Sequence, residues 1–112
     1  MKEVYVHLFH ILVVGSLFLY VGIKSTATPN FMFPILFALG IVIILYHGYK
    51  TFVKVVAHKN PWVNLFHICI VGPLLIYIGY NKQATPRAAY EFLLMLAFAS
   101  IGYHGYYMIN NQ

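Results

Sequence analysis

Apolar positions fall along the chain in four stretches of helix length, separated by shorter polar breaks. The stretches cover approximately residues 5–23, 31–49, 62–80 and 88–109. Each provides close to the roughly 20 apolar residues that a helix needs to cross the hydrocarbon of a bilayer. The pattern therefore predicts an all-α integral membrane protein with four spans.

Small polar residues and proline mark where the helices end. Thr28 and Pro29 follow the first stretch, and Thr85 and Pro86 follow the third. Both breaks are typical of tight turns, because proline fixes φ and removes a backbone donor. The connector at residues 50–61 is longer, and its first half is able to prolong the second helix along the membrane interface.

The chain contains the same helical hairpin twice. Residues 6–49 align with residues 63–106 without a gap, at an offset of 57, with 20 identities in 44 positions. The identities include Leu-Phe-His-Ile, Ala-Thr-Pro and Tyr-His-Gly-Tyr in one register. A repeat of this length predicts a duplicated supersecondary unit. We expect a first transmembrane hairpin over 1–57 and a second over 58–112, together forming one compact bundle.

Both hairpins have the same orientation in the membrane, because each contains an even number of spans. Parallel repeats of this kind are related by a pseudo-twofold axis along the membrane normal. The expected fold is a four-helix bundle of alternating up and down helices. The first stretch is a permanent span rather than a cleaved leader, since its copy lies in the middle of the chain.

Composition agrees with this fold and narrows the chemistry. The 112 residues are 62% hydrophobic and 8% charged, whereas about a quarter of the residues in a soluble domain are charged. Glu3 and Glu91 are the only acids, which excludes paired-carboxylate hydrolases and cation sites made of oxygen ligands. Cys69 is the single cysteine, and its apolar surroundings indicate packing. Nothing in the sequence indicates an enzyme.

The seven basic residues are scattered, so nucleic acid is not an expected partner. Those on the side of the termini are Lys2, Lys50, Lys54 and Lys59, and those on the other side are Lys24, Lys82 and Arg87. The positive-inside rule then predicts that the termini are cytoplasmic. The expected partners are the lipid bilayer and either further copies of the chain or a larger membrane complex.

Four histidines form the candidate site, because the repeat retains them in pairs. His10 corresponds to His67, and His47 corresponds to His104. Each repeat has one histidine near the start of its first helix and one near the end of its second. Antiparallel helices bring these positions to one level, so we expect a single layer of four imidazoles near the termini. His7 and His58 are not duplicated in the repeat, and we expect both to lie at the membrane interface.

Small residues accompany the histidines. Gly40 lies on the face of His47, and Ala97 and Ser100 lie on the face of His104. On a membrane helix, small residues mark a close approach of helices or room for a bulky group. A second stripe of small residues, on another face of the first and third helices, consists of Gly15, Gly22, Gly72 and Gly79. It predicts a contact with a neighbouring helix or with a second protomer.

Three roles for the histidine layer are compatible with the sequence. Neutral imidazoles from facing helices are ligands for haem b and, less suitably here, for copper or zinc. In that role Tyr46 and Tyr103 would support the ligands together with the small residues, and the terminal-side lysines Lys50, Lys54 and Lys59 would bind haem propionates. We therefore expect a haem-binding or metal-binding membrane subunit.

Two alternatives remain open. Histidine titrates near pH 6.5, so the layer is also suited to a small proton-linked or pH-gated channel. Imidazoles that hydrogen-bond between helices serve packing alone, which predicts a structural membrane component.

Overall fold

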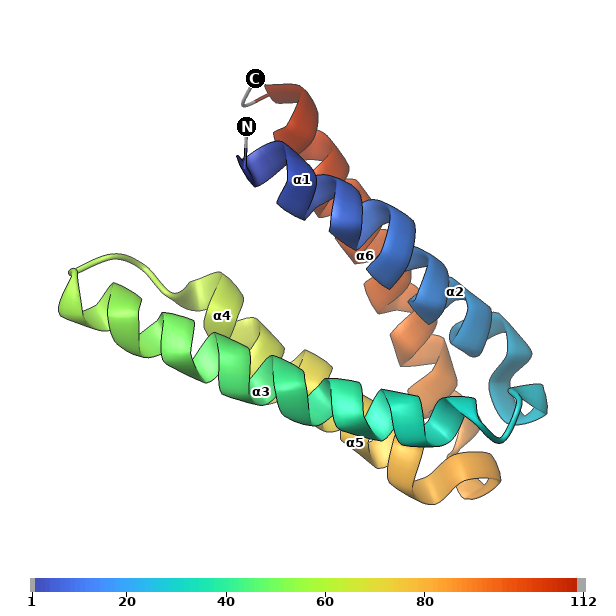
Figure 1. The fold of residues 1–112 in the computed structure, drawn as a ribbon. Coiled ribbons are helices and arrows are strands. Elements are labelled where there is room, and N and C mark those ends of the chain that lie inside the picture. Colours follow the sequence, from blue (N-terminus) through green and yellow to red (C-terminus); the bar gives the residue numbers. More distant parts are fainter. Residues whose placement is uncertain (1, 111–112) are drawn as a thin grey trace. The chain divides into compact units, whose positions relative to one another are not determined.

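Helices account for most of the chain in the computed structural model, which describes residues 2–110 and the side chains of residues 4–110 (Figure 1). The first helical run consists of α1 (Lys2–Phe9), η1 (His10–Val14) and α2 (Gly15–Lys24), and the second is α3 (Met32–Val56). The third consists of α4 (Trp62–Phe66), η3 (His67–Val71) and α5 (Gly72–Asn81), and the fourth is α6 (Arg87–Asn110). Two short 3-10 turns, η2 (Ser25–Ala27) and η4 (Lys82–Ala84), follow α2 and α5.

All four runs are long and apolar enough to cross a membrane. They cover Val4–Ala27, Met32–Val56, Trp62–Ala84 and Arg87–Asn110, and each has 23 to 25 residues. At about 1.5 Å per residue, each run exceeds the roughly 30 Å of hydrocarbon in a bilayer. The part of the chain that the structure describes contains no strand. The predicted all-α fold with four apolar helices is confirmed.

The second helix is longer than its apolar stretch. α3 continues to Val56, so Lys50 and Lys54 lie on the helix and the connector shrinks to residues 57–61. This extension follows the pattern of apolar and basic residues that the sequence shows there. The side chain of Lys2, another of the terminal-side bases, lies outside the described residues.

The first and third runs end in the same unusual backbone conformation. Ser25 has φ 54° and ψ −126°, and Lys82 has φ 52° and ψ −127°. These residues are 57 positions apart. The threonine that follows each turn is buried, and the hydroxyl of Thr85 donates to the carbonyl of Ile78 at 3.3 Å. The Thr-Pro breaks are therefore compact turns, as the sequence predicts.

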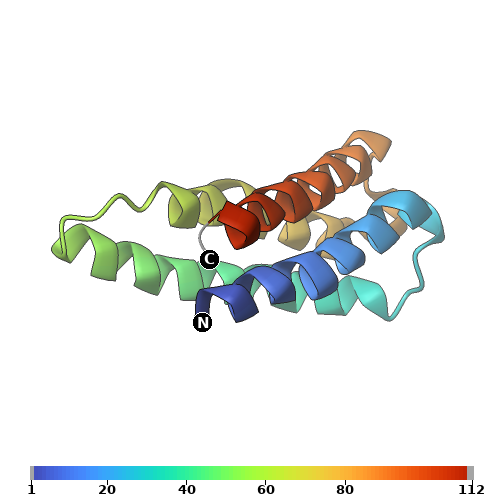
Figure 2. The same cartoon turned by 90° about the horizontal axis from the view of Figure 1, so that it is seen from above.

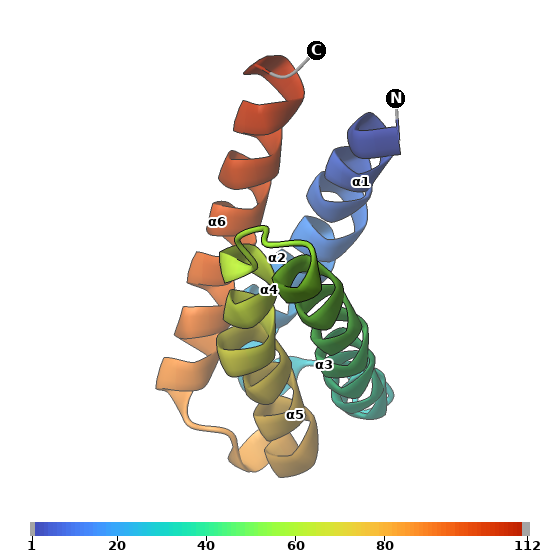
Figure 3. The ribbon, with the colours of Figure 1, turned by 90° about the vertical axis from the view of Figure 1, so that its left-hand side faces the viewer.

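Two compact units make up the chain, and each combines helices from both repeats. Unit 1 pairs the first run with α6, and the two lie side by side in the views of Figure 1 and Figure 2. Unit 2, Thr26–Thr85, pairs α3 with the third run, as Figure 3 shows. The hairpin boundaries at 1–57 and 58–112 stay a prediction, and they do not coincide with these units.

Glycines allow close helix contact within unit 1. A Cβ atom on Gly15 would lie 2.7 Å from Cγ1 of Ile101, and one on Gly22 would lie 3.1 Å from Cα of Leu94. Neither position accepts a side chain unless the neighbour moves. The glycine stripe of the first helix therefore contacts α6.

Unit 2 uses the corresponding positions in the same way. A Cβ atom on Gly72 would lie 2.5 Å from Cγ1 of Ile44, and one on Gly79 would lie 2.7 Å from the backbone nitrogen of Phe37. Each of these residues is 57 positions away from its counterpart in unit 1, so equivalent residues make equivalent contacts. The predicted stripe contact is with a neighbouring helix in both units.

Both first helices of the repeats contain a π-helical turn, which the hydrophobic pattern does not predict. η1 begins at His10 and η3 begins at His67, and each ends directly before a glycine of the stripe. Pro73 follows η3 but Ser16 occupies the equivalent place after η1, so proline is not the cause of the π turn. π-helical turns are rare and occur frequently at functional sites.

Candidate functional site

The histidines form one stacked couple in each unit. In unit 1 the rings of His10 and His104 are stacked, with centroids 4.1 Å apart and planes 21° apart. In unit 2 the rings of His47 and His67 are stacked, also at 4.1 Å, with planes 14° apart. Each couple joins the histidine at the start of a π turn to the histidine near the end of the opposing helix. The single layer of all four rings stays a prediction.

One histidine in each couple is fixed by its own helix. Nδ1 of His10 donates to the carbonyl of Val6 at 2.8 Å, and Nδ1 of His67 donates to the carbonyl of Val63 at 2.7 Å. A carbonyl accepts only, so the proton of each neutral ring lies on Nδ1. This contact sets the tautomer and the orientation of the ring, and it leaves the lone pair on Nε2.

The other histidine in each couple receives a second polar neighbour from the opposing helix. Nδ1 of His104 lies 2.8 Å from Nδ1 of His7, which makes an imidazole–imidazole hydrogen bond. In unit 2 the amide of Asn64 donates to Nδ1 of His47 at 2.7 Å. His7 and Asn64 are themselves 57 positions apart. The two repeats therefore make the same hydrogen bond to a histidine with different residues, a histidine in one and an asparagine in the other.

His7 is the functional candidate that sequence reasoning misses. Its ring is only partly exposed and bonds to the buried His104, which is 8% exposed, so His7 belongs to the candidate site. Its place at the membrane interface stays a prediction. The available signal was its spacing, since His7 and His10 lie three residues apart on one helix face. The same spacing indicates Asn64, which is 4% exposed and lies three residues before His67.

Two buried polar atoms near the couples have no hydrogen-bond partner within the described residues. They are Oδ1 of Asn64 in unit 2 and Oγ of Ser100 in unit 1. Ser100 lies one turn before His104 on α6, on the same face of the helix. Each couple therefore has a buried oxygen nearby that could form a further hydrogen bond.

The small residues on the histidine faces serve close packing of the helices. A Cβ atom on Gly40 would lie 2.7 Å from the carbonyl oxygen of Gly72, so α5 already occupies the space beside Gly40. Ala97 is fully buried in the core. The tyrosines that precede the histidines, Tyr46 and Tyr103, place their rings edge-on to His47 and His104 at 5.1 Å.

The lysines proposed for propionates lie around the end of α3. Lys50 and Lys54 are partly buried on the helix, and Lys59 is exposed in the connector. His58 lies beside Lys59 with a φ of 58°, and its side chain is exposed. Its place at the membrane interface stays a prediction. A role of these lysines in binding propionates stays a prediction.

Ring stacking determines what the couples present to a ligand. Among the residues with described side chains, no group of three or more histidine, cysteine or acidic residues is arranged to hold a metal ion. The lone pairs of an imidazole lie in its ring plane, so nearly parallel stacked rings do not direct two lone pairs at one point. Haem b, copper or zinc would require the rings to turn, and binding of these groups stays a prediction.

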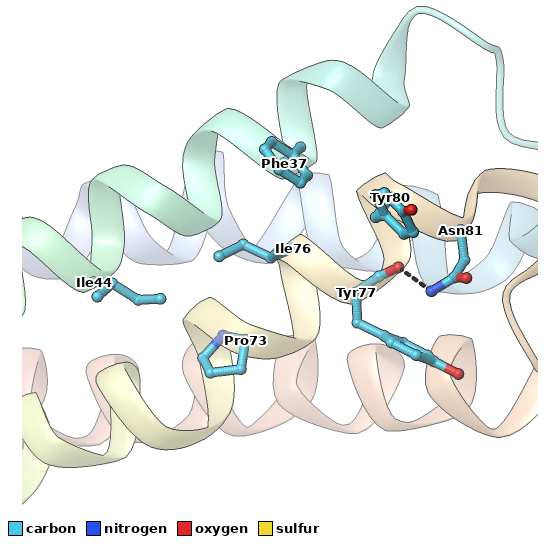
Figure 4. Close-up of a pocket in the computed structure, with 7 residues that line it drawn as sticks. All are labelled: Phe37, Ile44, Pro73, Ile76, Tyr77, Tyr80 and Asn81. Atoms are coloured by element: carbon cyan, nitrogen blue, oxygen red, sulfur yellow. Dashed lines mark hydrogen bonds between the residues drawn. The ribbon is translucent and has the colours of Figure 1, made fainter.

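A separate pocket of about 410 Å³ lies on unit 2 between α3 and α5 (Figure 4). Phe37, Ile44 and Ile76 contribute apolar side chains to its lining. The amide of Asn81 donates to the carbonyl of Tyr77 at 2.8 Å and so is bonded within its own helix (Figure 4). The lining contains no histidine, so the pocket is distinct from the couple in unit 2.

No protein family model, curated protein or solved structure matches this chain. The geometry of the two couples is therefore the basis for inferring what the protein does.

Proposed function

We propose that this chain is a four-span integral membrane protein made of a tandem repeat, in which paired imidazoles hold opposing helices together. The observation that carries the proposal is the recurrence of the stacked couple, at the same 4.1 Å separation, from residues 57 positions apart. The equivalent glycine contacts of the two units support the same conclusion. The protein would act as a structural component of its membrane rather than as an enzyme.

Imidazole couples are suited to this role because hydrocarbon provides no hydrophobic force between helices. Helix association in a bilayer depends on close packing and on interhelical hydrogen bonds, each contributing about 0.6 to 2 kcal/mol. Aromatic stacking adds about 0.5–1.5 kcal/mol beyond the area it buries. A stacked and hydrogen-bonded couple therefore stabilises a helix pair by about 1–3 kcal/mol.

The core beyond the couple favours packing over conduction. On α6, the face of His104 continues to Ala97 and Leu93, both of which are fully buried and apolar. Proton transfer across a membrane needs a continuous series of polar groups or waters. On this face of α6, apolar side chains therefore separate His104 and Ser100 from the opposite end of the helix.

Lipid is the expected surrounding of the outer faces, which carry many exposed aromatic and aliphatic side chains. We infer that the termini are cytoplasmic, because four bases lie on their side of the membrane and three lie on the other. The four are Lys2, Lys50, Lys54 and Lys59, and the three are Lys24, Lys82 and Arg87.

Substitution of His104 tests the packing role. His104→Phe retains an aromatic ring for stacking and loses the hydrogen bond to His7, whereas His104→Ala loses both. We expect the free energy of unfolding in mixed micelles, measured by circular dichroism during SDS titration, to fall by about 1 kcal/mol for Phe and about 3 kcal/mol for Ala. His58→Ala, in the exposed connector, is the matched control and should change stability little.

The same samples separate packing from the alternatives. The absorption spectrum and metal content of the purified wild-type protein report haem or metal, and proton flux into liposomes reports conduction. A Soret band or a stoichiometric metal that disappears in His104→Phe would replace the packing role by ligand binding. Equal free energies of unfolding for His104→Ala and His58→Ala would also refute the packing role.

A further inference from the structure

We propose that unit 1 contains a binding site for one proton, shared between His7 and His104, and that unit 2 lacks it because Asn64 replaces one imidazole. The proposal goes beyond the packing role. It rests on the 2.8 Å contact between the Nδ1 atoms of His7 and His104, and on the 2.7 Å amide contact at the same place in unit 2.

The contact between two Nδ1 atoms determines how many protons the pair accepts. At this distance one Nδ1 carries a hydrogen and donates it, and the other accepts with its lone pair. The donor ring is then unprotonated at Nε2, and the acceptor ring carries its own hydrogen at Nε2. A proton taken from water therefore binds Nε2 of the donor ring, which makes that ring an imidazolium without breaking the contact.

The first proton strengthens the contact, and a second one breaks it. Hydrogen bonds from a charged donor are roughly twice as strong as those between neutral groups. A second proton has only the accepting Nδ1 left to bind, where two N–H groups would point at each other across 2.8 Å. The pair therefore takes up one proton rather than two.

Unit 2 has a different proton balance because an amide is not basic. Asn64 donates to Nδ1 of His47, so the hydrogen of His47 lies on Nε2. Protonation of His47 must then occur at Nδ1, where it displaces the bond that the amide donates. Unit 2 offers one basic nitrogen at this contact, and unit 1 offers two.

Other titratable groups in unit 1 surround the pair. His10 stacks on His104, and Tyr103 places its ring edge-on to His104 at 5.1 Å and contacts Tyr107. A charge on the pair opposes a second charge on His10, because like charges at this distance repel. Glu3 lies one turn before His7 in the sequence, and its side chain is outside the described residues.

Two further differences between the repeats add a hydroxyl group to the helices of unit 1. Ser100 occupies the position of Ile43, and Tyr90 occupies the position of Phe33. The buried hydroxyl of Ser100 has no hydrogen-bond partner within the described residues and lies one turn from His104. A hydroxyl beside the pair lowers the cost of holding charge there, because its dipole can reorient toward the imidazolium.

Imidazole ¹⁵N resonances of the full-length protein in detergent micelles test the proposal between pH 8 and pH 5. We expect the rings of His7 and His104 to titrate together at one midpoint, with an N–H···N coupling across their contact. His7→Asn copies unit 2 into unit 1 and should abolish the titration of His104 in this range. Asn64→His copies unit 1 into unit 2 and should give His47 a titration that the wild-type protein lacks.

His58→Asn is the control and should leave the resonances of His104 and His47 unchanged. The proposal is overturned if His104 titrates identically in His7→Asn, or if Asn64→His leaves His47 without a titration. The second variant keeps the test decisive if the first fails to fold, which circular dichroism shows. A packing role alone moves neither midpoint, so the outcome is independent of the stability test above.

Discussion

Gly79→Ala is predicted to destabilise unit 2, although alanine favours a helix more than glycine does. The added Cβ atom would lie 2.7 Å from the carbonyl oxygen of Phe33 and 2.7 Å from the backbone nitrogen of Phe37. Both neighbours are backbone atoms of α3, so no side-chain rotation relieves the clash. The two helices must move apart, and the contacts along the α3–α5 interface lengthen with them.

The magnitude follows from two opposing terms. Replacing glycine by alanine in a helix gains about 1 kcal/mol from propensity. Overpacking a close contact costs about 1–3 kcal/mol, and a backbone neighbour places this site at the upper end of the range. We expect Gly79→Ala to lower the free energy of unfolding by about 2 kcal/mol in total.

Gly48→Ala is the matched control, because it lies on α3 of the same unit and its Cβ would meet nothing within 4 Å. It should gain up to about 1 kcal/mol from propensity alone. SDS titration followed by circular dichroism measures both variants, and the fluorescence of Trp62, the single tryptophan, reports on unit 2. Equal effects of the two substitutions would falsify the helix contact through Gly79.

Two further predictions concern the turns and the membrane. Lys82→Gly should raise the free energy of unfolding by about 1 kcal/mol, because φ 52° with ψ −127° strains a residue that has a side chain. Gln83→Gly in the same turn is the control and should not raise it. A Lys82→Gly variant that is less stable than the wild type would contradict this interpretation of the turn. Cys69 is exposed on the surface of the third run, which we propose to span the membrane. A membrane-impermeant maleimide should therefore label Cys69 in liposomes only after SDS is added. Lys59→Cys in a Cys69→Ser background is the control and should label without SDS, and equally fast labelling of Cys69 would place the third run outside the hydrocarbon.

The hydrophobic pattern was sufficient to predict the four helices, since each is a long and predominantly apolar stretch bounded by polar residues. The offset of 57 also identified His10, His47, His67 and His104, and the structure joins them in two couples. It did not reveal which helices pair, because short turns suit both a hairpin and an exchange of helices between repeats. Glycine positions alone do not select a partner helix. The contacts of Gly15 with Ile101 and of Gly72 with Ile44 show which helices pair.

The polar neighbours of the couples were missed for a related reason. Identical residues identify the equivalent positions of the two repeats, whereas His7 differs from its counterpart Asn64. Both residues nevertheless lie one helical turn from a histidine of a duplicated couple and hydrogen-bond to the couple. Positions where two copies differ in chemistry but share a contact are informative about function, because the contact shows that both are in the same site.

Chain connectivity gives the extra hydrogen bond of unit 1 a further consequence. The helices of unit 2 are joined by a connector of residues 57–61, whereas the helices of unit 1 are joined only through all of unit 2. A longer closing segment costs more entropy, so the helices of unit 1 are held less firmly by the chain and depend more on side-chain contacts. His7 and His104 supply such a contact at the end of unit 1 that carries the termini. Because the first proton strengthens this bond, uptake of one proton should tighten the half of the molecule that the chain itself restrains least.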